Sequence, residues 1–92
     1  MESDEPKTVS IILNTSKDVF DAFMKEDKGS AELWVGEDTI YVEPNKKYSD
    51  LEDDHSLYIS GDIFGMTQDE AVSAAVATVR MEYGNFEYTD IG

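Results

Sequence analysis

The densest group of side chains that could do chemistry is an acidic run between residues 50 and 54. It consists of Asp50, Glu52, Asp53 and Asp54. Carboxylate oxygens are the ligands that hard cations such as Ca²⁺ prefer, and a calcium-binding EF-hand loop is the best-defined pattern of this kind. Such a loop needs glycine at its sixth position and glutamate at its twelfth, where the chain has His55 and Gly61. The pattern fails at both positions, and we predict no specific metal site here.

The other residue combinations needed for catalysis are missing from the sequence. His55 is the single histidine and the chain has no cysteine, so a thiol nucleophile with a histidine base cannot form. Gly61 and Gly65 lack the Lys-Ser/Thr pair that completes a phosphate-binding loop. The motifs of serine hydrolases, zinc proteases and dinucleotide-binding proteins do not occur either. We therefore expect a protein that is not an enzyme and that uses no cofactor.

Charge is the most unusual property of the chain. Its 92 residues include 21 Asp or Glu and 7 Lys or Arg, giving a net charge of −14. This charge disfavours direct contact with nucleic acid or an anionic membrane and favours a basic protein surface as the partner. The same charge can instead serve solubility. Halophilic adaptation is a third explanation, but all the basic residues except Arg80 are lysines, whose long apolar stems a salt-adapted surface should avoid.

Two segments have the spacing of helices that bury one apolar side. The clearer one is Thr67–Tyr83, where Thr67 and Glu70 form a capping-box pattern. Its apolar residues recur at helical spacing and are Val72, Ala75, Val76, Val79 and Tyr83. The other is Thr15–Asp27, with Thr15 as the expected N-cap. Its apolar stripe consists of Val19, Phe20, Phe23 and Met24. The small apolar residues of the helix at Thr67–Tyr83 suit close packing against a sheet.

Alternation of apolar and polar residues predicts the strands of that sheet. They are expected at Thr8–Asn14, Ser30–Val35, Thr39–Glu43 and Leu57–Ser60, with residues 36–38 forming a hairpin turn. The alternation at Phe86–Thr89 predicts either an edge strand or a docked tail. Ile63 and Phe64 are expected to pack under the start of the C-terminal helix.

The resulting order is β-α-β-β-β-α, with a further strand if Phe86–Thr89 pairs. Short connections between the middle strands favour a mainly antiparallel sheet, and both helices have a single apolar stripe. We therefore predict an α+β two-layer sandwich with two helices on one face of the sheet. Residues 1–7 are expected to be a disordered tail and residues 8–92 a single domain. The acidic N-terminus lacks the features of a targeting peptide, which favours the cytoplasm.

With both helices on one face, the other sheet face is predicted to be open. Alternation places on it Glu32, Trp34, Tyr41, Glu43 and Tyr58. Aromatic side chains beside carboxylates are typical of protein-binding surfaces. The alternative is that Trp34 is buried in a core on both sides of the sheet. Our predicted partner-binding residues are Glu32, Trp34, Tyr41, Glu43, Asp50, Glu52, Asp53 and Asp54.

The acidic residues are spread over the predicted elements instead of forming one tail. Duplex DNA carries about one charge per 1.7 Å of its axis, so a charge of −14 corresponds to about 24 Å of duplex. In size, acidity, lack of cysteine and mixed topology, the chain resembles small acidic nucleic-acid mimics of the phage anti-CRISPR and anti-restriction type. It also resembles immunity proteins that block nuclease toxins. No specific motif carries this resemblance.

The resemblance implies an inhibitor that occupies the basic nucleic-acid-binding surface of a phage-defence effector or a nuclease. The alternative is a general protein-interaction module or small subunit whose acidity serves solubility. The two differ in whether carboxylates or aromatic residues are essential for binding.

Overall fold

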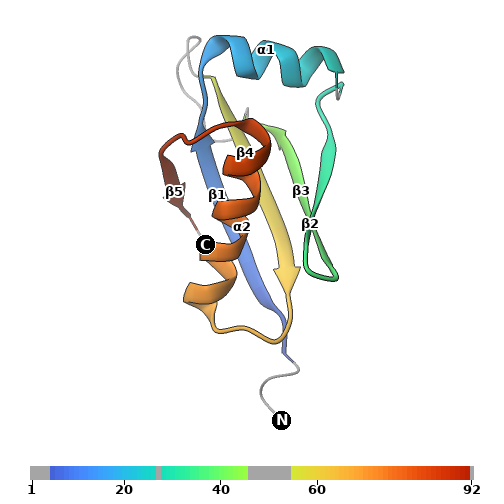
Figure 1. Ribbon diagram of the computed structural model, residues 1–92, viewed down its shortest axis with the longest axis vertical. Coiled ribbons are helices and arrows are strands. Elements are labelled where there is room, and N and C mark those ends of the chain that lie inside the picture. The colour runs from blue at the N-terminus through green and yellow to red at the C-terminus, as the bar shows by residue number, and fades with distance from the viewer. Residues whose placement is uncertain (1–4, 27, 46–54, 92) are drawn as a thin grey trace.

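The computed structural model describes residues 5–26, 28–45 and 55–91. Its elements are β1 (Lys7–Asn14), α1 (Lys17–Glu26), β2 (Ala31–Val35), β3 (Asp38–Pro44), β4 (Ser56–Ile63), α2 (Gln68–Tyr83) and β5 (Tyr88–Asp90). The strands form one antiparallel sheet in the order β2-β3-β4-β1-β5. α2 lies along one face of this sheet, and α1 crosses its end (Figure 1). The predicted α+β class and element order are confirmed, but α1 lies across the end of the sheet instead of beside α2 on its face (Figure 1).

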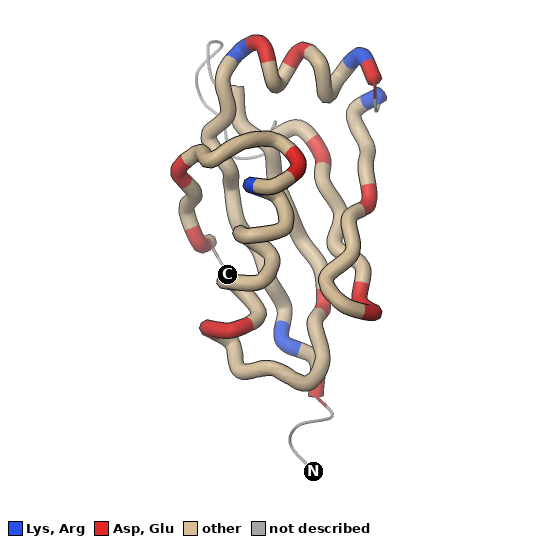
Figure 2. Tube along the Cα trace, viewed as in Figure 1, with Lys and Arg blue, Asp and Glu red and all other residues tan. Residues whose placement is uncertain are grey.

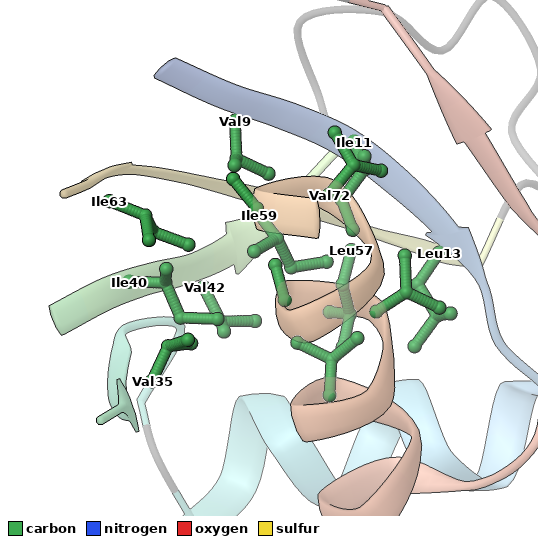
Figure 3. Close-up of a cluster of buried hydrophobic side chains, with 14 of the residues drawn as sticks. Val9, Ile11, Leu13, Val35, Ile40, Val42, Leu57, Ile59, Ile63 and Val72 are labelled. Atoms are coloured by element: carbon green, nitrogen blue, oxygen red, sulfur yellow. The ribbon is translucent and has the colours of Figure 1, made fainter. Parts of the chain in front are cut away.

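The core lies between α2 and the sheet because alternate strand residues point to that side. The face is lined by Val9, Ile11, Leu13, Ile40, Val42, Leu57, Ile59 and Ile63, which are at most 1% exposed. Figure 3 shows these side chains gathered against α2. Ala71 and Ala75 of α2 are fully buried, and their small side chains let the helix approach the sheet closely. From α1, Phe23 completes the core and contacts the ring of Tyr83 edge-on, with 5.9 Å between centroids.

The ends of α2 follow local sequence signals. Thr67 Oγ1 accepts a hydrogen bond from Glu70 N at 3.2 Å, and Glu70 Oε1 accepts one from Thr67 N at 3.0 Å. This is the predicted capping box. At the other end Gly84 has φ +132°, and its N–H donates to Arg80 O at 2.9 Å. The helix therefore begins and ends close to the predicted residues.

The start of α1 differs from the prediction. Thr15 does not cap the helix, because its Oγ1 donates to the carbonyl oxygen of His55 at 2.6 Å. Ser16 takes this role instead, and its Oγ accepts a hydrogen bond from Val19 N at 3.3 Å. The helix consequently begins at Lys17. A contact with a residue 40 positions away decided between two adjacent capping side chains.

β4 is longer than predicted and extends through Gly61 to Ile63. A glycine usually weakens a strand, which is why the prediction ended this strand at Ser60. Here a Cβ at position 61 would lie 2.9 Å from Thr39 O and 2.9 Å from Ile40 Cγ2. Glycine is therefore the residue that lets β3 and β4 come together.

Phe64 also differs from the prediction. Its side chain is 51% exposed instead of packing beneath α2, whereas Ile63 is buried as expected. Its N–H donates to Asp38 Oδ2 at 3.2 Å, which ties the end of β4 to the start of β3.

The segment after α2 is a strand, not a docked tail. β5 pairs with β1, and Arg80 holds the segment that leads to it. Arg80 Nε donates to Phe86 O at 2.8 Å, and the guanidinium carbon lies 5.3 Å from the centre of the Tyr88 ring.

The first strand starts one residue earlier than predicted. β1 begins at Lys7, which is the last residue of the predicted N-terminal tail. None of the described helices is both long and apolar enough to span a membrane.

Candidate protein-binding face

The sheet face opposite α2 carries polar and aromatic side chains. We define the open face as Ser10, Ile12, Glu32, Trp34, Tyr41, Glu43, Tyr58, Ser60 and Asp62. These residues come from β1, β2, β3 and β4, and each alternates along its strand with residues that point into the core. Trp34 and Tyr41 are 67% and 51% exposed. The alternative that Trp34 is buried in a second core is therefore wrong.

Strand register brings carboxylates directly beside aromatic rings on this face. Tyr41 lies opposite Glu32 on β2 and opposite Ser60 on β4. Tyr58 of β4 lies opposite Glu43. Directly opposed side chains have Cβ atoms about 4.5–5.5 Å apart. A partner side chain with a cationic tip and an apolar stem can therefore contact a ring and a carboxylate at the same time.

Two hydrogen bonds order the side chains on the inner strands. Thr8 Oγ1 donates to Asp62 Oδ1 at 3.0 Å across the β1–β4 pair. Tyr58 OH donates to Ser10 Oγ at 3.5 Å. The shorter contact, from Thr8, orients the Asp62 carboxylate before a partner arrives, which lowers the entropy lost on binding, whereas the contact of Tyr58 is long for an O–H···O hydrogen bond.

Four of the eight predicted binding residues lie within the part of the chain that the structure describes. Glu32, Trp34, Tyr41 and Glu43 lie together on the two strands of the β2–β3 hairpin. The predicted loop residues Asp50, Glu52, Asp53 and Asp54 lie outside the described residues. The prediction missed Asp62 because it ended β4 before this residue. The alternation of Leu57, Ile59 and Ile63 was the signal that could have extended the strand.

A shallow depression of about 520 Å³ lies at the end of the sheet where the hairpin turns. It is lined by Val35, Gly36, Glu37, Asp38, Phe64, Gly65 and Met66. Its apolar lining residues are Val35, Phe64 and Met66, and Glu37 and Asp38 contribute two carboxylates. This combination extends the acidic and apolar character of the open face to the hairpin end.

Acidic residues are distributed along the described part of the chain trace (Figure 2). Because 21 acidic residues face 7 basic ones, at least 14 carboxylates have no basic residue of their own. Lys17 does contact Asp21, with Nζ 2.6 Å from Oδ2 at an exposed position. The hydrogen bond and the negative charge of Asp21 raise the pKa of Lys17. An exposed pair of this kind contributes little to stability and leaves the wider repulsion in place.

This repulsion predicts that salt stabilises the fold. Raising NaCl from about 10 mM to 150 mM shortens the Debye length from about 30 Å to about 8 Å. We expect the melting temperature to rise by about 4–8 °C, corresponding to about 1 kcal/mol of relieved repulsion. Thermal unfolding followed by circular dichroism would measure this. The variant Glu26→Lys/Glu82→Lys/Glu87→Lys should show a smaller rise, and a flat response of the native chain would contradict the prediction.

Metal-ligating and titratable side chains give no second candidate site on the described residues. No three or more His, Cys, Asp or Glu residues in the described ranges are grouped so that they could hold a metal ion. His55 is half-buried, and its ring contacts Phe20 edge-on with 5.7 Å between centroids. This packing and the hydrogen bond from Thr15 to its carbonyl oxygen give His55 a role in joining α1 to the start of β4.

The open face is thus the described surface whose geometry best suits binding of another protein. It combines exposed aromatic rings, one hydrogen-bonded carboxylate, that of Asp62, and a four-strand platform beneath them. Comparison with family models, with curated proteins and with solved structures gives no match to this chain.

Proposed function

We propose that this protein is an acidic inhibitor that occupies the basic nucleic-acid-binding surface of a partner protein. The partner would be of the phage-defence effector or nuclease type, and binding would exclude nucleic acid by competition. The observation that carries the proposal is the open face, where Glu32, Glu43 and Asp62 lie among exposed aromatic residues. The high net negative charge supports it further.

The charges and the rings have different tasks in this proposal. Negative charge on the whole molecule steers it toward a basic groove and speeds association. Carboxylates on the open face then pair with Lys and Arg side chains that otherwise contact phosphates. Trp34 and Tyr41 exclude water at the centre of the contact, where desolvated aromatic residues contribute most of the binding energy.

A general interaction module is the second candidate. It is favoured by the exposure of Trp34 and Tyr41, because two large exposed aromatic rings suffice to anchor a partner of any charge. In that case the acidity serves solubility, and the carboxylates of the open face contribute little to affinity.

Competition with nucleic acid tests the inhibitor proposal. Partners would be captured from a host lysate on the immobilised chain, and the purified complex would be challenged with DNA and with RNA. We expect nucleic acid to displace the partner, and we expect affinity to fall as salt rises. A partner that binds equally well in the presence of its own nucleic acid would rule out competition for a shared surface.

Charge reversal on the open face provides the matched test. The variant Glu32→Lys/Glu43→Lys/Asp62→Lys should weaken partner binding by about 100-fold, because three charge pairs at about 1 kcal/mol each are lost. The control Glu26→Lys/Asp69→Lys/Glu82→Lys makes the same change in net charge at exposed sites on α1 and α2. We expect the control to lose much less affinity in isothermal titration calorimetry. Equal losses would mean that net charge alone governs binding.

A further inference from the structure

β2 is an outer strand with one unpaired edge. All five of its residues pair with β3, from Ala31 opposite Val42 to Val35 opposite Asp38. On its other side no described element lies beyond it (Figure 1). Along a strand the backbone N–H and C=O groups alternate in direction, so some groups of β2 point away from β3 and lack a strand partner.

Several of the usual protections of an outer strand are missing from β2. Natural edge strands are short or carry charged residues, proline or a bulge that discourages another strand from pairing. Residues 31–35 contain no proline and no lysine, and their register with β3 is regular. Glu32 is the one charged residue of the strand, and Trp34 beside it is 67% exposed.

The hydrophobic layer also continues up to this edge, where it is only partly covered. Leu33 and Ala31 point toward the α2 side of the sheet and pack against the core, but they are only partly buried. Their partners on β3, Ile40 and Val42, are at most 1% exposed. An additional strand beside β2 would bury the exposed parts of Leu33 and Ala31 together with its own inward residues.

We propose that this strand is β2 of a second copy, paired antiparallel about a twofold axis at Leu33. A five-residue strand has one antiparallel register that pairs all of its residues with a copy of itself, and the central residue is Leu33. In this register Leu33 meets Leu33 of the second copy, and Ala31 meets Val35. Glu32 lies opposite Trp34, so no carboxylate of β2 directly opposes another.

Charges near the ends of β2 are compatible with the same arrangement. Lys28 precedes the strand, whereas Glu37 and Asp38 follow it. Antiparallel pairing brings the start of each strand beside the end of the other, so opposite charges approach. The two chains together carry −28, twice the charge of −14 of one chain. Because this repulsion is screened beyond about 8 Å at physiological ionic strength, we expect association to strengthen as salt rises.

The dimer would join the two open faces. The twofold axis of an antiparallel strand pair is perpendicular to the sheet, so both copies of α2 lie on one side and both open faces on the other. The paired β2 strands would place Trp34 and Glu32 of both copies at the centre of one continuous acidic surface. This arrangement doubles the carboxylates and aromatic rings available to one partner.

Cysteine cross-linking tests the register, since the native chain has no cysteine. Leu33→Cys should form a disulfide-linked dimer under mild oxidation, because the two thiols meet at the axis. Ala31→Cys is the matched control in the same strand. In the proposed register, the two copies of residue 31 lie four residues apart along the strand direction, which is about 13 Å. A disulfide needs Cα atoms within about 7 Å. Cross-linking of both variants to the same extent, or of neither, would overturn the proposed register.

Sedimentation equilibrium of the native chain gives a second test that needs no variant. We expect a monomer–dimer equilibrium whose dimer fraction rises with concentration and with NaCl. Leu33→Lys should be monomeric under the same conditions, because two lysines would meet at the axis. A native chain that is monomeric at every concentration and salt level would refute the dimer. No partner protein is present in either experiment, so failure here is distinct from failure of the proposed inhibitor function.

Discussion

Replacing Ile11 by alanine should lower the free energy of unfolding by about 3–4 kcal/mol, whereas the same change at Ile12 should cost about 1 kcal/mol. The two residues are adjacent in β1 but point to opposite faces. Ile11 is fully buried beneath α2 and lies opposite Ile59, so its loss leaves a cavity that the packed core cannot fill. Ile12 lies on the open face and is half-exposed, so truncation there removes less buried surface.

Urea denaturation followed by circular dichroism would measure both variants. Each retains the same strand, the same residue type and the same change in volume, so the comparison isolates the face on which the side chain lies. We expect the slope of the free energy against urea to remain similar, with the difference appearing in the midpoint. Similar destabilisation of the two variants would mean that both sheet faces are covered, and the open face would then be unavailable to a partner.

Trp34→Ala and Tyr41→Ala should each weaken partner binding by about 2 kcal/mol or more, which is about a 30-fold loss of affinity. Both rings are more than half exposed, so their removal should change the free energy of unfolding by less than the loss of Ile11. Their binding role rests on desolvation at the centre of an interface. Isothermal titration calorimetry with the captured partner would measure the loss.

Met81→Ala is the appropriate control for the aromatic variants. Met81 is 88% exposed on α2, on the opposite side of the sheet from Trp34 and Tyr41, and its removal also deletes a large apolar side chain. Trp34 is the single tryptophan of the chain, so its fluorescence in the native protein should also shift on binding. Native affinity in both aromatic variants would remove these rings from the binding surface.

The aromatic and charge-reversal variants together separate the two candidate functions. Loss of binding in both sets would indicate a partner whose basic surface also presents an apolar contact, as expected of an inhibitor that competes with nucleic acid. Loss in the aromatic variants alone would favour a general interaction module. Loss in the charge variants alone would leave a purely electrostatic contact, which salt should abolish.

Elements governed by neighbouring residues were predictable. α2 has its capping box within residues 67–70 and its apolar stripe within the helix itself, and both the helix and its ends agree with the prediction. The hairpin was predictable for the same reason. Gly36 has φ +64° at the first central position of a two-residue turn, a place that suits glycine.

Features governed by distant residues were not predictable. Thr15 and Ser16 are both good capping residues, and the carbonyl oxygen of His55 removed Thr15 from that role. In the sequence, Gly61 interrupts the strand pattern. The structure explains it, because the backbone of β3 leaves no room for a side chain at this position. The hydrogen bond that Thr8 donates to Asp62 likewise depends on the pairing of β1 with β4, because the two residues are 54 positions apart.

Local patterns were enough to predict the α+β class, the two helices, the composition of the open face in the hairpin and the strong negative charge. These follow from local alternation, helical spacing and residue counts, which need no knowledge of long-range contacts. The strand order β2-β3-β4-β1-β5 became known from the folded chain, and with it which carboxylates lie beside which rings and which strand has a free edge. The reason is that strand pairing depends on how the whole chain closes around α2, and alternation within one strand contains no information about its neighbour.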